Sequence, residues 1–360
     1  MSTTFLIALI SGFFSFITLP LLYKFMPQTS TPFNERPQSQ IFLPALITIF
    51  TICGAAYFLC FDNKDFLNSF NFIELSAPFV LTAILCLISK YNKTGKFFVP
   101  SLLLASIAAS LTIPTDSIAA ILPFATSINR LIIIFSWFSF SYIYRYTNNG
   151  SNTLSIQTAA IAFGIAILAL LKAIPFFLGL LGLIFACASA SYTAIKWPPA
   201  KNNISDNIAS CIGFMTFALI VWTGAENALS CAVIFSMLFI TDFIWAALLR
   251  LTFIEQYSDI KNNTAYQWAL YSGFSAQLAT SFLCRAQVLM VLIGIFQAYS
   301  DQPYSLLLFA AIISIWLLYK LRNLSQETKS LRDINKEVIA DLQDRINDVK
   351  QYFDREDDRQ

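Results

Sequence analysis

The chain has 360 residues, of which 57% are hydrophobic and only 12% are charged. This composition is too apolar for a soluble domain, which needs a polar surface. The formal net charge is +2, and no basic face is concentrated enough to bind a phosphate backbone, so a nucleic-acid partner is excluded. Apolar runs long enough to cross a bilayer fill most of the chain, and the sequence therefore predicts an all-α polytopic membrane protein.

Charge divides the chain into two regions. Residues 321–360 hold 8 of the 23 Lys and Arg residues and 10 of the 21 Asp and Glu residues. We therefore expect a transmembrane domain over 1–320 and a cytoplasmic tail over 321–360.

About eleven transmembrane helices are expected. The expected spans begin near Phe5, Ile41, Phe72, Phe97, Asn129, Leu154, Ala173, Ile208, Asn227, Ala276 and Tyr304. The span near Ile208 is expected to be short. The stretch from Asp116 to Ser127 is expected to form a half-length surface segment.

Basic residues in the loops predict the orientation, because cytoplasmic loops carry an excess of Lys and Arg. One alternating set of loops holds Lys24, Arg36, Lys90, Lys93, Lys96, Arg145, Lys196, Lys201, Arg250 and Lys261, and the opposite set holds only Lys64, Arg130 and Lys172. The first set is expected to be cytoplasmic, in a bacterial inner membrane. The N-terminus is then outside and the C-terminus is cytoplasmic.

The tail has the pattern of a coiled coil. Its two heptad series are Leu321, Thr328, Asn335, Leu342, Val349 and Leu324, Leu331, Val338, Arg345, Tyr352. Most of these positions are apolar, and charges fill the outer face, which favours self-association or pairing with a partner helix. The alternative is an amphipathic helix lying on the membrane, but the even mixture of acid and base on its polar face argues against it.

Two ionisable residues lie inside apolar runs, where charge is costly and is usually paired or functional. Asp242 and Arg285 each lie roughly 12–15 Å from the expected cytoplasmic ends of their helices, at 1.5 Å per residue. We expect these two side chains to form an ion pair between adjacent helices. All seven cysteines lie in apolar runs without a CxxC pair, which is typical of small buried thiols.

The loops of the expected cytoplasmic face resemble a known family. The stretch YTAIKWPPAKNNISDN resembles a motif that reads roughly N-W-x-P-A-x-x-F-x-G-D-x-G-S in the polyprenyl-phosphate N-acetylhexosamine-1-phosphate transferases. That family includes phospho-N-acetylmuramoyl-pentapeptide transferase. The stretches TLPLLYKFMPQTSTPFNERPQSQIFLPAL, WFSFSYIYRYTNNGSNTLSIQTAAIAFG and FITDFIWAALLRLTFIEQYSDIKNNTAYQWALYSGFS extend the resemblance over roughly residues 10–300.

The resemblance implies a reaction at the cytoplasmic face, in which a UDP-sugar donates its sugar-1-phosphate to polyprenyl phosphate during cell-envelope glycan synthesis. Because both reactants are anionic, a magnesium ion and basic side chains must offset their charge. Magnesium prefers carboxylate and phosphate oxygens. Mg²⁺ is therefore the cofactor expected if the protein is active.

The residues that carry this chemistry mostly depart from the family pattern. No acidic residue lies between Glu74 and Asp116, so the family's Asp-Asp pair is missing near Cys86 to Ser89. Asn149 and Asn152 stand where the family has aspartates, and an amide adds no negative charge. The chain contains no histidine, whereas the family has a His-rich loop.

The positions that match give the candidate site. They are Trp197, Pro198, Pro199, Ala200, Lys201, Asp206, Asp242, Arg250 and Gly273. The resemblance implies that Asp206 is the catalytic, magnesium-binding aspartate. It implies substrate contacts for Lys196, Lys201, Asn149, Asn152, Arg250 and Asp259.

Each of these residues also has a structural interpretation. Asp206 fits an N-cap of the helix expected near Ile208. Lys196 and Lys201 fit positive-inside anchors, and the asparagines fit a polar turn around Gly150.

Three functions compete for this sequence. The first is a working transferase with an altered metal site, and the second is a non-catalytic relative that binds lipid-linked intermediates or partner proteins through its groove and coiled coil. The third is an unrelated transporter, which the lack of internal symmetry disfavours. Because charge compensation dominates phosphoryl transfer, the missing acids predict impaired or absent catalysis within a transferase fold.

Overall fold

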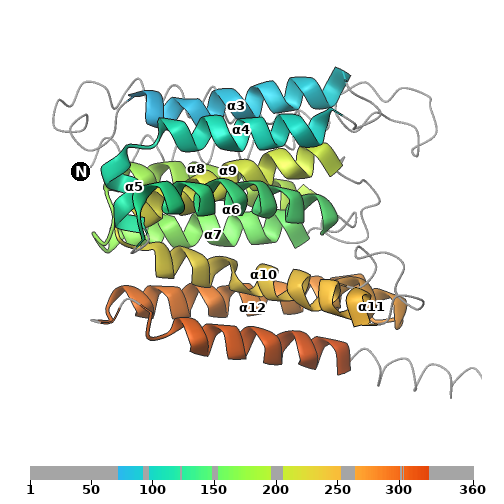
Figure 1. Cartoon of the computed structure of the whole chain (residues 1–360). Coiled ribbons are helices and arrows are strands. Elements are labelled where there is room, and N and C mark those ends of the chain that lie inside the picture. The colour runs from blue at the N-terminus through green and yellow to red at the C-terminus, as the bar shows by residue number, and fades with distance from the viewer. Residues whose placement is uncertain are drawn as a thin grey trace, which may run out of the picture.

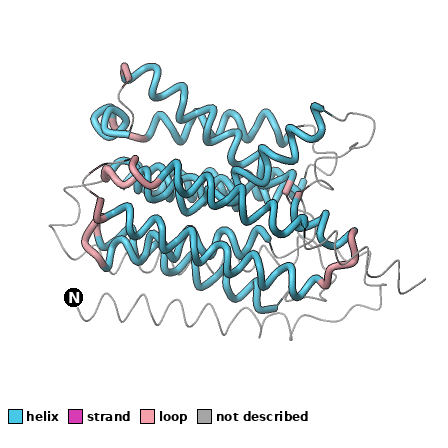
Figure 2. The backbone as a smooth tube through the Cα atoms, turned by 90° about the horizontal axis from the view of Figure 1, so that it is seen from below, coloured by secondary structure: helices cyan, strands magenta, loops and turns pink. Residues whose placement is uncertain are grey.

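The computed structural model describes residues 72–91, 97–121, 124–147, 153–195, 206–252, 264–300, 302 and 304–323. Within these ranges the chain is built from helices and short connections, without strands. Most of the helices lie roughly parallel or antiparallel to one common axis (Figure 1). Figure 2 shows the same bundle from below.

The labelled helices follow one another in the order of the chain. They are α3 (Phe72–Tyr91), α4 (Phe98–Thr112), α5 (Thr115–Ile121), α6 (Thr126–Tyr146), α7 (Thr153–Leu170), α8 (Phe176–Ile195), α9 (Asp206–Ala225), α10 (Leu229–Thr252), α11 (Ala265–Tyr271) and α12 (Ala276–Ala298). One more described helix covers 307–323 and is called helix 307–323 below.

Five of these helices are long and apolar enough to cross a membrane. They are α7, α8, α9, most of α10 (Leu229–Leu251) and α12. A hydrophobic stretch of this length predicts a transmembrane helix, so the expected membrane class is confirmed. The expected spans from Phe72 onward each coincide with a described helix that begins within a few residues, whereas those near Phe5 and Ile41 lie outside the described residues.

The expectation of a short span near Ile208 is wrong, because α9 is 20 residues long. The helix begins at Asp206, so this residue is in the first turn and not before it. A carboxylate is favourable in the first turn of a helix, which explains why the helix extends into the polar residues. The expected half-length segment is confirmed as the seven-residue helix α5.

The core is continuous from α3 to α10, and a second hydrophobic cluster joins α10, α11, α12 and helix 307–323. Glycines bring α7 and α8 close together. A Cβ atom at Gly179 would lie 2.2 Å from the Cβ of Ala169, and one at Gly182 would lie 2.7 Å from the carbonyl oxygen of Ala162. Small residues that allow such close approach are typical of packed membrane helices.

The ring of Phe235 on α10 fills a space between α7 and α12 that exists because both helices have a glycine there. A Cβ at Gly164 of α7 would lie 2.7 Å from this ring, and a Cβ at Gly294 of α12 would lie 2.3 Å from it. The backbone of the same residue is also bound, because Nε2 of Gln287 donates to the carbonyl oxygen of Phe235 at 2.7 Å. Phe235 therefore fixes three helices relative to one another.

The two ends of the bundle are called the α5 end and the α11 end, after the short helix at each (Figure 1). The helix ends that flank residues 148–152, 196–205 and 253–263 lie at the α11 end. The loops that carry most of the predicted site residues therefore leave the bundle at this end.

Candidate functional site

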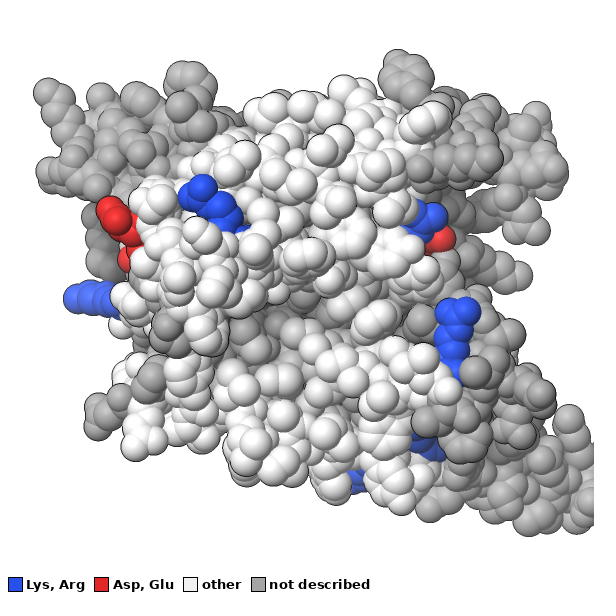
Figure 3. Space-filling model, viewed as in Figure 1, with Lys and Arg blue, Asp and Glu red and all other residues white. Residues whose placement is uncertain are grey.

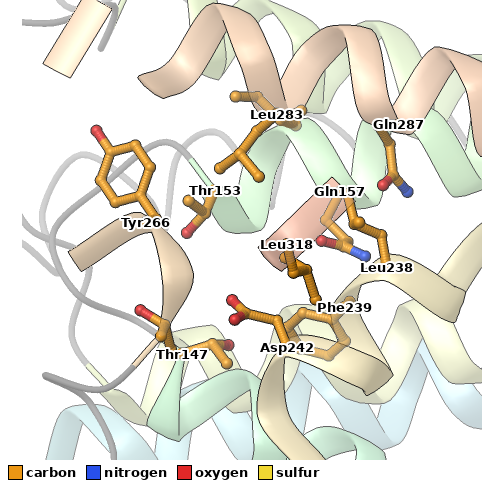
Figure 4. Close-up of a pocket in the computed structure, with 12 residues that line it drawn as sticks. Thr147, Thr153, Gln157, Leu238, Phe239, Asp242, Tyr266, Leu283, Gln287 and Leu318 are labelled. Atoms are coloured by element: carbon orange, nitrogen blue, oxygen red, sulfur yellow. The ribbon is translucent and has the colours of Figure 1, made fainter. Parts of the chain in front are cut away.

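A cleft opens among the helices at the α11 end (Figure 4). Its lining combines polar side chains with leucines and a phenylalanine. The lining residues are Thr147, Thr153, Ile156, Gln157, Leu238, Phe239, Asp242, Thr264, Tyr266, Leu283, Gln287 and Leu318. They come from α6, α7, α10, α11, α12 and helix 307–323, so the cleft is a junction of six helices and the segments beside them.

Asp242 is the acidic side chain of this lining. Its Oδ1 accepts a hydrogen bond of 2.8 Å from the backbone N–H of Ala265, the first residue of α11. The side chain of Thr264, which precedes α11, makes no capping bond. The carboxylate of Asp242 therefore takes the role of the missing cap from another helix, a favourable position for negative charge.

The expected ion pair between Asp242 and Arg285 is wrong. Arg285 is exposed on the outside of α12, whereas Asp242 binds α11 and lies in the field of the Arg322 guanidinium. A carboxylate at membrane depth needs compensation, and here a backbone amide and a different arginine provide it.

Arg322 connects helix 307–323 to the neighbouring helices. Its guanidinium carbon lies 5.4 Å from the ring centroid of Trp245 on α10 and 5.6 Å from that of Trp268 on α11. Both distances are within the range of attractive cation–π contacts. Arg322 thus links the end of helix 307–323 to α10, to α11 and electrostatically to Asp242.

Two buried glutamines in the lining keep a polar atom without a partner. Gln157 of α7 is 8% exposed, and Gln287 of α12 is 2% exposed. The Nε2 of Gln157 and the Oε1 of Gln287 have no hydrogen-bond partner in the described part of the chain. Each such group costs desolvation energy, and here a buried donor and a buried acceptor line the same cleft.

Tyr266 contributes an aromatic wall from α11. Its hydroxyl lies 3.3 Å from Oγ1 of Thr280 on α12, at hydrogen-bond distance. Burial raises the pKa of the Tyr266 phenol, and the bond to Thr280 partly opposes that shift. The phenol is therefore neutral at physiological pH and can serve as a donor or an acceptor.

Of the predicted site residues, Asp206 and Arg250 are described. Asp206 is half-buried in the first turn of α9, and Arg250 is exposed in the last turn of α10. Neither lines the cleft. The other predicted residues, Asn149, Asn152, Lys196, Lys201 and Asp259, lie outside the described residues.

The two glutamines and Tyr266 were not among the predicted site residues. The available signal was an uncharged polar residue inside a long apolar run, as at Gln157 in TLSIQTAAIAFG. That signal is weaker than a charge, because a buried amide costs less than a buried ion.

The described residues do not fit a magnesium ion. No group of three His, Cys, Asp or Glu side chains gathers anywhere within the described ranges. Asp242 is already bound to the α11 backbone, and Asp206 lies on a different helix. A site for Mg²⁺ usually combines carboxylates with substrate phosphates, and this part of the chain does not assemble such a set.

Charge on the surface is confined mainly to the two ends of the bundle, with a broad uncharged region between them (Figure 3). Near the α11 end of the described helices lie Arg145, Arg250, Lys320 and Arg322, whereas Arg130 and Lys172 lie near the α5 end. The uncharged region carries exposed apolar side chains such as Leu104, Phe135 and Leu292. This distribution suits a bilayer around the middle of the bundle.

Fold and cleft together define a class: a multi-pass helical membrane protein with a polar cleft at one end of its bundle. Within that class the comparisons with known proteins assign no family. The sequence matches no family model and no curated protein. The function must therefore be argued from the residues themselves.

Proposed function

We propose that this protein is a divergent relative of the polyprenyl-phosphate N-acetylhexosamine-1-phosphate transferases, with impaired or absent catalysis. It acts on, or binds, a UDP-sugar and polyprenyl phosphate at the membrane surface. The observation that carries the proposal is that the α11 end unites the polar cleft with the helix ends that flank the motif-bearing loops.

The direction of the helices supports the proposed relationship to the transferases. The resemblance rests on loops before α7, before α9 and after α10, and a joint active site requires all three at one end. Helices that alternate in direction meet this requirement. Arg250 in the last turn of α10 adds a cation that can attract the phosphates of either substrate.

The impaired catalysis follows from charge. Transfer of a phosphoryl group between two anions depends on a metal and on fixed positive groups that stabilise the transition state. Asp206 alone is a weak magnesium site, and Asp242 is committed to the start of α11. The chain is therefore expected to hold substrates better than it converts them.

Release of UMP is the test of this proposal. The purified protein is supplied with UDP-N-acetylhexosamine, undecaprenyl phosphate and Mg²⁺. We expect no UMP above the level of a protein-free control. Release that is abolished by Asp206→Asn would show a working transferase and would refute the impaired-catalysis reading.

A second candidate is a non-catalytic scaffold for lipid-linked glycans or partner proteins. It is favoured by the cleft, where uncharged amides outnumber acids. In this reading the predicted coiled coil of the tail recruits a second copy or a partner helix. Residues 324–360 lie outside the described part, so the coiled coil stays a prediction, tested by whether the full-length protein loses self-association when Leu331 and Leu342 are replaced by Asp.

The number of spans and their orientation are also part of the proposal. We infer eleven spans in a bacterial inner membrane, with the N-terminus outside and the α11 end cytoplasmic. The four basic residues near the α11 end, compared with two near the α5 end, support this orientation under the positive-inside rule. Labelling of a cysteine introduced at exposed Tyr271 should require a membrane-permeant reagent in intact cells.

A further inference from the structure

We propose that the cavity at the bottom of the cleft is a binding site for a neutral hydrogen-bonding group, and that α11 is the cap that opens to admit it. The proposal does not depend on the resemblance to the transferases. It stands on the two unpartnered glutamine atoms and on the contacts that hold α11.

The cavity is small in this structure. Its volume is about 30 Å³, which is room for about two water molecules. Pockets that hold a complete small molecule measure about 300–1,000 Å³. A ligand larger than water can therefore enter only if one wall moves.

The chemistry of the cavity selects a neutral group. Gln157 offers a free donor at Nε2, and Gln287 offers a free acceptor at Oε1. The orientation of the Gln287 amide is fixed because its Nε2 donates to the Phe235 carbonyl, which leaves the oxygen for the cavity. A carboxamide or a hydroxyl group presents both an acceptor and a donor, so either can satisfy the two glutamines at once.

The surroundings disfavour an anionic guest. Leu238, Phe239 and Leu283 share the lining with the glutamines, and these apolar walls disfavour an ion. An anion would also meet the carboxylate of Asp242, which faces the same space (Figure 4).

The movable wall is α11. It is only seven residues long, and Thr264 and Tyr266 at its start line the cavity. The contacts that hold it include the Asp242 carboxylate to the N–H of Ala265, the Arg322 guanidinium over Trp268, and the Tyr266 hydroxyl to Thr280, beside its apolar packing. The glutamines belong to the long helices α7 and α12, so they stay in place when α11 moves.

The cap is tested by the rate at which a cysteine inside the cleft reacts. Thr153→Cys places a thiol in the lining, and modification by a water-soluble methanethiosulfonate is followed on the peptide that carries residue 153, so native cysteines do not interfere. Adding Asp242→Ala should raise the rate by about tenfold or more, because a hydrogen bond to a charged group then no longer holds the closed form.

Two further variants keep this test decisive. Arg322→Gln releases Trp268 without touching the cavity and should also raise the rate, which covers the case that Asp242→Ala does not fold. Asp116→Ala, at the α5 end, is the matched control and should leave the rate unchanged. An unchanged rate in a folded Asp242→Ala or Arg322→Gln protein would refute the cap.

The ligand chemistry is tested with two small amides in the Thr153→Cys, Arg322→Gln protein. Acetamide has a donor and an acceptor, whereas N,N-dimethylacetamide has only the acceptor. We expect acetamide to slow the labelling and the dimethyl compound to have little effect, and Gln157→Leu should abolish the protection. Equal effects of both amides, or none, would mean that the cavity holds water only and would refute the binding site.

Discussion

The two ends of the bundle use buried polar side chains in different ways. At the α5 end, Nδ2 of Asn129 donates to the carbonyl oxygens of Ile118 and Phe124 at 3.3 and 3.2 Å, and Nη2 of Arg130 donates to the carbonyl oxygen of Ile113 at 3.3 Å. These bonds satisfy the backbone around α5. Nε of Arg130 has no partner among the described residues, and at the α11 end Gln157 and Gln287 each keep one such atom, but the two glutamines line the cleft.

Some of the connections between helices also differ in length between the two ends. At the α5 end, α7 and α8 are joined by residues 171–175, and α9 and α10 by residues 226–228. At the α11 end, residues 196–205 and 253–263 separate the helices. Short connections need internal polar contacts to turn the chain, whereas long connections are where binding residues usually lie. The longer connections of the α11 end are consistent with the binding role proposed for it.

The largest effect is expected where Phe235 packs between α7 and α12. Gly294→Val places a Cβ where only 2.3 Å separates it from the Phe235 ring. We expect a loss of about 1–3 kcal/mol in the free energy of unfolding from overpacking, and a clear fall in melting temperature in detergent. Val288→Ala on the exposed face of α12 is the control, and a similar fall there would contradict the account.

A smaller loss is expected when the α5 end loses its polar bonds. Asn129→Leu leaves the carbonyl oxygens of Ile118 and Phe124 without their donor. A typical hydrogen bond contributes about 0.5–1.5 kcal/mol net, and the bond to Phe124 is only partly buried, so the melting temperature should fall by less than in Gly294→Val. Unchanged stability would show that these bonds do not hold α5.

The matched substitution at the α11 end should behave in the opposite way. Gln157→Leu removes a donor that has no partner among the described residues, so stability should stay equal or rise slightly. Thermal unfolding of the Asn129 and Gln157 variants, measured side by side, checks the contrast between the ends. Equal losses at both sites would remove the distinction.

The smallest effect concerns pH. Burial raises the pKa of the Glu226 carboxyl, which lies between α9 and α10 at the α5 end. Because the folded pKa lies above the unfolded value, the folded state binds the proton more tightly, and this stabilisation is lost as the pH rises through the folded pKa. The side chain is only partly buried, so the change should be slight, and Glu226→Gln should flatten the dependence of the melting temperature on pH just above the ordinary carboxyl range. A melting temperature that depends more steeply on pH in Glu226→Gln than in the unmodified protein would contradict this prediction.

The helices were predictable because long apolar runs specify membrane helices almost independently of their neighbours. α11 was not expected as a helix, since seven residues are too few to show a periodic pattern. The half-length α5 was also predicted from the sequence.

The candidate site was less predictable. Asp242 was recognised as a costly charge, but its partner depends on which face of each helix turns inward, and that is decided by packing. Tertiary packing placed Arg322 near Asp242 and left Arg285 exposed on α12, although the expected depth of Arg285 along its helix matched that of Asp242. The glutamines became visible only when α7 and α12 were seen to meet at one cleft.

The most direct test of the proposal that the α11 end holds a UDP-sugar and polyprenyl phosphate without converting them measures binding and turnover in one sample. Purified protein is mixed with labelled UDP-N-acetylglucosamine, undecaprenyl phosphate and Mg²⁺, and both the retained nucleotide sugar and the free UMP are counted. The account predicts retention that weakens in Arg250→Ala, with UMP at the background level. Rapid UMP formation, or no retention at all, would contradict it.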